Sequence, residues 1–409
     1  MEPDTTDKYF IGRCTIVALL FGLTVYSGAA RSAPDALDYV NQAIDIRNET
    51  RNVTVPAGYV LEILATNLDA PRILTFAENG DLFAGSRSGR VYRIPAPYTK
   101  AEVFVATGGY PHSVDFYRGE ILIAKTEGLY RAPYRRGQAR VDSAAVKLWA
   151  PLPAGRGHNS RTVRVGPDGE VYVSLGISGN CSDQFLDESY PFAVRRGGVV
   201  RLRDLAPQPV WEAFATGLRN PVGFDWHPRT QIMYASNNGP DHLGFELPPE
   251  SFAELRPNSF HGMPWYQFDG ESLRRDECIR SRPPHDIESV SVPVATFPAR
   301  NAPMGVAFVP AGAMHPSLEY DAVVALRGSW GTQPHGNSGG DPATRRPPKL
   351  VVVRFDADKA YRVDDLVTGF QLPDGKRWAR PVGVAIGSDG ALYFSSNEGV
   401  DGLFRLRRR

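Results

Sequence analysis

Six segments of the chain repeat one pattern of apolar and polar positions: an apolar stretch, a turn with Gly or Pro, and a second alternating apolar stretch. The copies occupy residues 71–86, 111–125, 160–176, 221–237, 303–327 and 381–397. Most are followed by a further apolar strand, at residues 89–94, 128–132, 197–202, 349–355 and 402–406. Short alternating runs joined by Asn-Gly, Asp-Gly or Arg-Gly pairs are typical of β-hairpins. The pattern therefore predicts six small sheets.

Six sheet units in one chain predict an all-β fold, a six-bladed β-propeller in which radial packing buries each sheet against its neighbours. A β-sandwich or a two-domain β protein is the alternative. We expect the apolar segment Tyr59–Leu64 to pair into the last blade and close the ring. Residues 34–48 are the stretch most able to hold a helix. The domain organisation we expect is one propeller over residues 56–409, preceded by an extension at residues 33–55.

Residues 1–32 differ from the rest of the chain. An uncharged apolar run from Cys14 to Val25 follows Lys8 and Arg13 and precedes small residues, as in a secretory signal peptide. The run is short for a membrane span. Because acidic residues outnumber basic ones in front of it, an uncleaved membrane anchor remains the alternative. We expect an exported protein, either secreted or periplasmic.

The charge of the chain excludes one class of partner. There are 46 Lys and Arg against 45 Asp and Glu, for a net charge of +1, and no long basic block. The chain thus lacks the positive charge that nucleic-acid binding requires. Outside the leader only Cys181 and Cys278 remain, and neither belongs to a zinc pattern. An exported protein could keep them as one disulfide bridge.

Polar residues gather at one position of the repeat. The alignment treats as equivalent Phe76, Phe116, Val165, Trp226, Phe308 and Ile386. In a propeller the first strand of each blade lines the central channel, so residues just before these strands converge at one mouth. There lie His158, Arg219, Asn220, Asn301 and Arg380. Arginine forks match carboxylates or phosphates, which predicts an anionic ligand. A histidine there suits a general base.

These residues belong to segments that carry a family resemblance. In order, the segments are GRGHNSR (155–161), GLRNPVGFDWHP (217–228), NNGPDHLGFELPPESFAEL (237–255), HGMPW (261–265), NAPMGVAF (301–308), ALRGSW (325–330) and RPVGVA (380–385). Together they resemble the glucose/sorbosone dehydrogenase family, six-bladed propellers that bind pyrroloquinoline quinone (PQQ) and calcium. The resemblance implies a dehydrogenase that oxidises a CH-OH group of an aldose or sorbosone-type sugar. It also implies an external electron acceptor, such as a quinone, a dye or a cytochrome.

The resemblance implies roles for individual residues. His158 would be the base that removes the proton from a sugar hydroxyl as hydride passes to the quinone. Arg219 and Asn220 would hold PQQ, and Arg380 would pair with one of its carboxylates. Arg327 occupies the place where family members put a basic residue against the quinone. Because PQQ is a planar tricarboxylate, three arginines beside it make electrostatic sense independently of the family.

The resemblance also implies a calcium site. The carbonyl groups of Gly239 and Pro240 would bind the ion, a hard cation that prefers oxygen ligands. Calcium would then polarise the quinone carbonyl that receives the hydride. Taken without the resemblance, a Gly-Pro pair is a tight turn.

The chain departs from the family at three places. Some active relatives have an acidic residue that orients the histidine where this chain has Ile177. Many have histidine before the Ala-Pro-x-Gly stretch, where this chain has Arg300 and Asn301. A loop rich in Gly, Pro and Asn at residues 331–348 follows Arg-Gly-Ser-Trp and could reshape the substrate pocket.

Two other functions stay open for these reasons. A non-catalytic propeller that binds a glycan or a protein is compatible with Ile177 and Arg300. A calcium-dependent propeller lactonase or other hydrolase would hold its metal with side-chain oxygens, but it would leave the arginines without a function. Side chains available for such a site are Asn220, Asn237, Asn238, Asp241 and Asn301. The sugar and the oligomeric state, a homodimer included, also remain open.

Overall fold

The computed structural model describes residues 36–203 and 209–409, and this part of the chain is almost entirely β. It contains no α-helix; its short 3-10 helices are η1 (Ser143–Ala145), η2 (Phe192–Val194), η3 (Ile287–Ser289), η4 (Pro316–Leu318) and η5 (Pro342–Thr344). No helix in these two ranges is long and apolar enough to cross a membrane. The predicted leader, residues 1–32, lies outside the residues that the structure describes.

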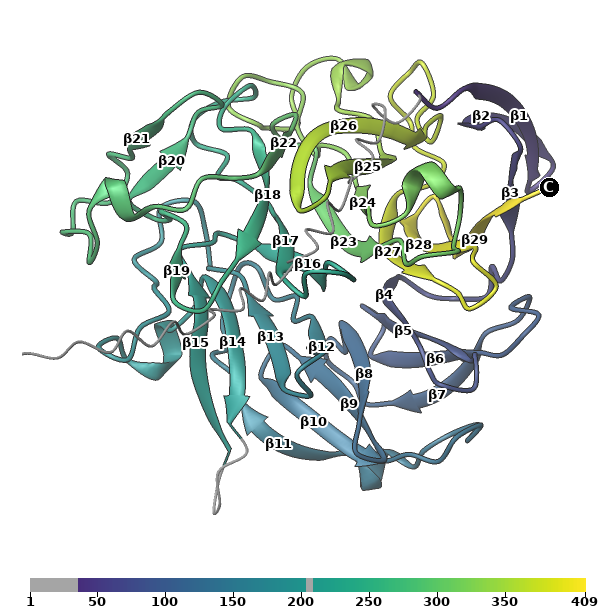
Figure 1. Ribbon diagram of the computed structural model, residues 1–409, viewed down its shortest axis with the longest axis horizontal. Helices are drawn as coiled ribbons and strands as arrows, with labels where there is room; N and C mark the ends of the chain where they lie inside the picture. The colour runs from purple at the N-terminus through teal and green to yellow at the C-terminus, as the bar shows by residue number, and fades with distance from the viewer. Residues whose placement is uncertain (1–35, 204–208) are drawn as a thin grey trace, which may run out of the picture. The chain divides into compact units, whose positions relative to one another are not determined.

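Six sheets form the blades of a ring, which Figure 1 shows with the inner strands at its centre. Blade one has β4 (Pro71–Phe76), β5 (Leu82–Ser86), β6 (Arg90–Ile94) and β7 (Glu102–Ala106). Blade two has β8 (Ser113–Tyr117), β9 (Glu120–Lys125), β10 (Gly128–Pro133) and β11 (Lys147–Pro151). Blade three has β12 (Val163–Val165), β13 (Val171–Leu175), β14 (Gly198–Arg203) and β15 (Val210–Thr216), extended by the parallel strand β19 (Ser259–Phe260).

The other three blades complete the ring. Blade four has β16 (Pro221–Trp226), β17 (Met233–Asn237), β18 (Glu250–Leu255) and β22 (Ala295–Phe297). Blade five has β23 (Pro303–Phe308), β24 (Ala322–Leu326), β25 (Lys349–Asp356) and β26 (Lys359–Val367). Blade six has β27 (Pro381–Ile386), β28 (Leu392–Glu398), β29 (Val400–Arg408) and the N-terminal strand β3 (Tyr59–Ile63). The pairing of β3 with β29 closes the ring, as the sequence predicts.

The innermost strand of each blade contains the aligned position of the repeat, and it comes first in the sequence in every blade except blade six, where the earlier strand β3 lies at the outer edge of the sheet. These strands are β4, β8, β12, β16, β23 and β27, so the predicted six-bladed propeller is confirmed. Neighbouring inner strands approach at the level of the backbone. A Cβ on Gly223 would lie 2.3 Å from the carbonyl oxygen of Met304, and one on Gly383 would lie 2.4 Å from that of Arg72. Glycine is required at such a close approach.

A hairpin precedes the propeller, and it replaces the helix that residues 34–48 were expected to hold. Its strands are β1 (Tyr39–Ile46) and β2 (Glu49–Pro56). Arg47 and Asn48 have φ angles of 49° and 67°, the left-handed pair that a two-residue hairpin turn requires. Helical geometry cannot continue through two left-handed residues. The hairpin belongs to the compact unit of residues 37–409, and Figure 1 shows it beside β3.

The apolar core is divided among the interfaces between blades. One cluster joins the hairpin to blades five and six through residues such as Val55, Leu350 and Leu392. Another joins blades three and four through residues such as Val199 and Phe224. The ring is therefore a rigid frame, and the long connections that leave it can vary in sequence.

The longest connections leave blades four and five, where the sequence predicts large loops. The excursion between β18 and β22 contains a small hairpin of β20 (Tyr266–Phe268) and β21 (Leu273–Arg275). The connection between β24 and β25 contains η5. Both excursions and the segment after β17 supply residues of the site described next.

Candidate functional site

The segments that precede the inner strands form one mouth of the channel. His158 precedes β12, Arg219 and Asn220 precede β16, and Arg380 precedes β27. Arg327 follows β24, whose end pairs with the start of β23. Hydrogen bonds link these segments from blade to blade, so the residues that the sequence assigns to the cofactor lie on one face of the ring.

His158 is partly buried, and its Nδ1 lies 2.6 Å from the carbonyl oxygen of Ile177. A carbonyl oxygen only accepts hydrogen bonds, so Nδ1 carries the proton and Nε2 keeps its lone pair. Burial, followed by the positive charge of Arg219, lowers the pKa of His158 to about 4. The imidazole is therefore neutral near pH 7 and can accept a proton at Nε2.

Two buried arginines hold the backbone of this histidine. Nη2 of Arg196 and Nη1 of Arg161 donate to the carbonyl oxygen of His158 at 2.7 and 3.0 Å. Nε of Arg196 also donates to the carbonyl oxygen of Gly176 at 2.7 Å. Burial lowers the pKa of Arg196 to about 10 and that of Arg161 to about 9, so both remain cations at neutral pH. The position of the imidazole is thus fixed from its own main chain.

Gly176 packs between His158 and Asn220. A Cβ at this position would lie 2.5 Å from Oδ1 of Asn220 and 2.6 Å from Cβ of His158. Glycine is therefore required for the two side chains to approach each other. The backbone N–H of Asn220 donates to Oδ1 of Asn237 at 2.9 Å, which fixes the start of β16.

Arg219 is buried, and its guanidinium contacts Asn180, Asp241 and the carbonyl oxygen of Asn238. Its Nη2 donates to Oδ1 of Asn180 at 2.7 Å and pairs with Asp241 at 3.3 Å. The same Oδ1 of Asn180 accepts the backbone N–H of Asp241 at 3.0 Å. The carbonyl oxygen of Arg219 accepts the N–H of Ile177 at 2.8 Å, which links this arginine to the histidine segment.

Arg327 and Arg380 form a second pair of cations. Both contact Glu398, at 3.1 Å from Arg327 and 2.5 Å from Arg380. Nε of Arg380 donates to the carbonyl oxygen of Arg327 at 2.8 Å, and Nε of Arg327 donates to Oδ1 of Asn397 at 2.9 Å. Burial, followed by the charge of Arg380, lowers the pKa of Arg327 to about 9. One carboxylate thus faces two guanidinium groups.

Arg72 and Arg87 add positive charge to this pair. Both guanidinium groups lie near the ring of Tyr110, 6.0 and 5.7 Å from its centroid, and both depress the pKa of Arg327. Arg72 is buried, and its Nη2 lies 3.4 Å from Nε2 of His112. Arg380, Arg72 and Arg87 lower the pKa of Arg327, and the carboxylate of Glu398 raises it. This part of the mouth therefore has an excess of positive charge.

Several polar atoms at this mouth are buried without a hydrogen-bond partner among the described residues: Nε of Arg72, Oδ1 of Asn159, Nε of Arg219, Oδ1 of Asn220 and Oδ1 of Asn301. Each such atom costs about 1–3 kcal/mol when it is left unsatisfied. A bound ligand with both donors and acceptors would satisfy them. A planar quinone with three carboxylates has the acceptors and the negative charge that the arginines require, so these residues fit PQQ.

The residues predicted to bind calcium do not fit that ion. The carbonyl oxygen of Pro240 accepts a hydrogen bond from Nη1 of Arg300. The same guanidinium lies 3.4 Å from Asp241, and its side chain is 1% exposed. The backbone N–H of Gly239 donates to Glu250, which is also buried. Of the two carbonyl oxygens predicted to bind calcium, that of Pro240 is therefore already engaged by a fixed organic cation, the guanidinium of Arg300.

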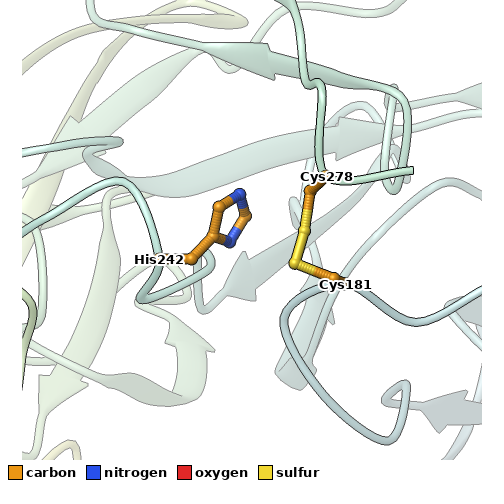
Figure 2. A group of neighbouring side chains, drawn as sticks. All are labelled: Cys181, His242 and Cys278. Carbon is orange, nitrogen blue, oxygen red and sulfur yellow. A yellow bond between two sulfur atoms is a disulfide. The ribbon is translucent and has the colours of Figure 1, made fainter. Parts of the chain in front are cut away.

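Cys181 and Cys278 form a disulfide bridge, the arrangement that the sequence leaves open (Figure 2). Their Cα atoms are 5.4 Å apart. Figure 2 also shows His242 beside the bridge, and the potential ligand atoms of the three residues lie within 4.8 Å of one another. Sulfur atoms in a disulfide are not thiolates, so the oxidised protein has no metal site here. The bridge instead ties the segment of Asn180, and with it Arg219, to the loop excursion after β18.

A cavity of about 460 Å³ lies at the opposite ends of the inner strands. Its walls include Thr75, Arg164, Asp225 and Ile386, and none of the residues predicted for the cofactor lines it. Asp225 is half-buried there, and its carboxylate accepts the backbone N–H groups of Trp226 in its own strand and of Phe308 in β23. Burial raises the pKa of Asp225 above its ordinary value. These contacts serve the closure of the ring.

Comparison with known proteins supports the architecture. No family model matches the chain. An uncharacterized protein of Borreliella burgdorferi is 23% identical over 374 residues, which cover 86% of this chain and 89% of that protein. A Trichoderma reesei enzyme of carbohydrate-active family AA12 superimposes with a TM-score of 0.72 at 16% identity, covering 92% of this chain and 100% of the other.

Two further solved structures are a PQQ domain and a PQQ-bound enzyme. The PQQ domain of pyranose dehydrogenase from Coprinopsis cinerea has a TM-score of 0.68 at 18% identity, over 88% of this chain and 97% of the other. The PQQ-bound aldose sugar dehydrogenase of Streptomyces coelicolor has a TM-score of 0.56 at 17% identity, over 86% and 99%. This chain has the fold of these sugar dehydrogenases.

The structure adds site residues that the sequence analysis missed. Asn180 and Glu398 pair with the predicted arginines, Arg87 adds charge, and Arg196 holds the backbone of His158. Glu398 could have been found, because the second strands of blades four and six end in similar Ser-Asn sequences, and the first of these leads into Asp241. Arg196 gives no such signal, since its contacts are to backbone carbonyls.

Proposed function

We propose that this protein is a PQQ-dependent sugar dehydrogenase that oxidises a CH-OH group of an aldose or sorbosone-type sugar. One observation carries the proposal: a neutral histidine with a free Nε2 shares one channel mouth with a cluster of buried arginines. The arginines suit an anionic cofactor, and the histidine suits a proton acceptor. The structural likeness to PQQ-binding sugar dehydrogenases agrees with this pairing.

In this proposal the arginines bind and orient the cofactor. Arg219 has a buried Nε without a partner in the described chain, and Asn220 has an unpartnered Oδ1, so both have bonding capacity directed at a ligand. Arg380 and Arg327 bind carboxylate already, in the form of Glu398, and would exchange part of that contact for a carboxylate of PQQ. PQQ, when bound, supplies the two-electron acceptor.

His158 acts on the sugar. Its Nδ1 proton is engaged by Ile177, so the lone pair on Nε2 accepts the proton of the hydroxyl group that is oxidised. PQQ, if bound, would supply the acceptor for the hydride that the same carbon loses. The sugar thus loses one proton and one hydride, and an aldose that reacts at C1 becomes a lactone. The external acceptor then takes the electrons.

The hydrogen bonding of the asparagines favours a dehydrogenase over a metal-dependent hydrolase. Oδ1 of Asn237 already accepts the backbone N–H of Asn220. Asp241 pairs with two guanidinium groups. The oxygens of Asn237 and Asp241 are therefore engaged, and the amide oxygens of Asn220, Asn238 and Asn301 alone are fewer than the roughly six to eight ligands that calcium takes. We extend the proposal to an exported location, which the leader-like N-terminus and the disulfide both support.

A titration with PQQ tests the cofactor assignment. The quinone absorbance would be followed while PQQ is added to purified wild type, Arg380→Gln and the control Arg362→Gln, whose arginine pairs with Asp364 on β26. We expect saturable binding by wild type and the control, and at least a tenfold loss in Arg380→Gln, since a hydrogen bond to a charged group contributes about 1.5–3 kcal/mol. Wild-type protein that does not bind PQQ would overturn the proposal.

A further inference from the structure

The loop of residues 239–247, where the resemblance places calcium, surrounds a buried guanidinium. Arg300 donates to the carbonyl oxygens of Pro240, Gly244 and Leu247, with Nε at 2.9 Å from Gly244. Its Nη1 also lies 3.4 Å from a carboxylate oxygen of Asp241. Three backbone carbonyls and a carboxylate are the kind of oxygen set that calcium prefers. Here all four are directed at one arginine.

We propose that Arg300 takes the place of the divalent cation, so that this loop is organised without metal. A guanidinium has five N–H donors in a planar fork, enough to engage several carbonyl oxygens at once. It cannot dissociate and does not depend on the calcium concentration. The inference that Arg300 organises the loop depends only on the contacts of Arg300. The effect of this loop on cofactor binding rests on the proposed function.

The local charge balance supports this assignment. Two carboxyl groups, the half-buried Asp241 and the buried Glu250, face the two guanidinium groups of Arg219 and Arg300. A doubly charged ion added here would leave excess positive charge in a buried place, which is strongly unfavourable.

The backbone of Arg300 is adapted to this role. Its φ angle is 67°, in the left-handed region that a long side chain rarely adopts. Such a conformation persists only where surrounding contacts require it. The 331–348 loop packs against the same pair, since a Cβ on Gly336 would lie 3.7 Å from Nε of Arg300 and 3.6 Å from Cβ of Asp241. The departure at position 300 and the unusual loop thus belong to one structural unit.

Through Asp241 the arginine also reaches the cofactor residues. Asp241 contacts Arg300 with one carboxylate oxygen and Arg219 with the other. Arg300 therefore positions Arg219 through this carboxylate, as a bound metal that fixed the loop would. Under the proposed function, PQQ binding by wild type is then independent of added calcium.

Metal binding and thermal unfolding of the full-length protein test this inference without PQQ. Wild type, Arg300→Ala and Arg346→Ala would be compared in a chelator and in millimolar calcium. Arg346 is the matched control, because it holds the same loop through Glu246 but does not contact the carbonyl oxygens around Arg300. We expect the wild-type Tm to be the same in both conditions, and that of Arg300→Ala to be lower and to rise with calcium.

The opposite result is equally clear. Wild type that binds one calcium ion in a calorimetric titration, loses it in Asp241→Asn and unfolds at least 5 °C lower in chelator would overturn the inference. These wild-type measurements remain decisive if Arg300→Ala fails to fold, and Arg300→Lys then supplies a milder variant with a lower Tm. Failure to bind PQQ would contradict the proposed function but would leave these readouts unchanged.

Discussion

The carbonyl oxygen of Ile177 lies 2.6 Å from Nδ1 of His158. Where some active relatives are expected to have an acidic side chain, this chain thus orients its histidine with the main chain. A carbonyl fixes the tautomer as a carboxylate does, but it adds no negative charge that would stabilise the imidazolium. Ile177 is therefore compatible with a histidine that acts as a base. The pKa of His158 is lowered here, whereas a carboxylate at Nδ1 would raise it.

The pH dependence of turnover follows from this environment. Burial and Arg219 lower the pKa of His158 from 6.5 to about 4. For the sugar reaction, kcat/KM of the PQQ-loaded enzyme should stay level as pH falls from 8 to about 5, and then fall through about 4. The free energy of unfolding should change in the same direction. The stability that neutral His158 contributes is fully present above pH 6.5 and is lost as the pH falls through about 4. A decline of kcat/KM centred near pH 6.5 would contradict this environment.

Gly176→Ala should damage the site while the fold remains. The added methyl group would collide with Asn220 and His158, at 2.5 and 2.6 Å. We expect PQQ affinity and turnover each to fall at least tenfold, with unchanged circular dichroism. Gly179→Ala is the matched control, because a Cβ there meets nothing within 4 Å. Equal activity in the two variants would show that His158 and Asn220 do not need this close approach.

The disulfide should stabilise both the fold and the cofactor site. It closes a loop of 97 residues, and removing a native disulfide typically costs about 2–5 kcal/mol of stability. Replacing both Cys181 and Cys278 by Ser should lower Tm and weaken PQQ binding, since Asn180 next to the bridge holds Arg219. Unfolding curves and the PQQ titration measure the two effects. A variant with wild-type Tm would show that the bridge adds no stability.

The fold could be predicted because the repeat is local. Each copy contains an inner strand, a turn and the strand that pairs with it, so the aligned positions Phe76 and Ile386 fall on inner strands of blades one and six. The hairpin of residues 39–56 was missed, since its turn depends on left-handed Arg47, a residue type with no preference for that conformation.

The site could be predicted only in part. Residues aligned by the repeat, such as His158 and Arg380, do gather at one mouth. The Ile177 carbonyl that orients the histidine belongs to the main chain, which has no residue-type signature. The occupation of the Pro240 carbonyl by Arg300 joins segments 60 residues apart in the chain, and only the folded loops bring them together.

The most direct test of the account is sugar-dependent dye reduction by PQQ-loaded wild type, His158→Ala and the control His285→Ala, whose side chain is exposed. An aldose panel supplies the substrates. We expect turnover by wild type and the control. In His158→Ala the turnover rate should fall about 100-fold or more, the range typical of a general base, while the affinity for PQQ is retained. Wild type that binds PQQ but oxidises no sugar, or His158→Ala with full turnover, would contradict the account.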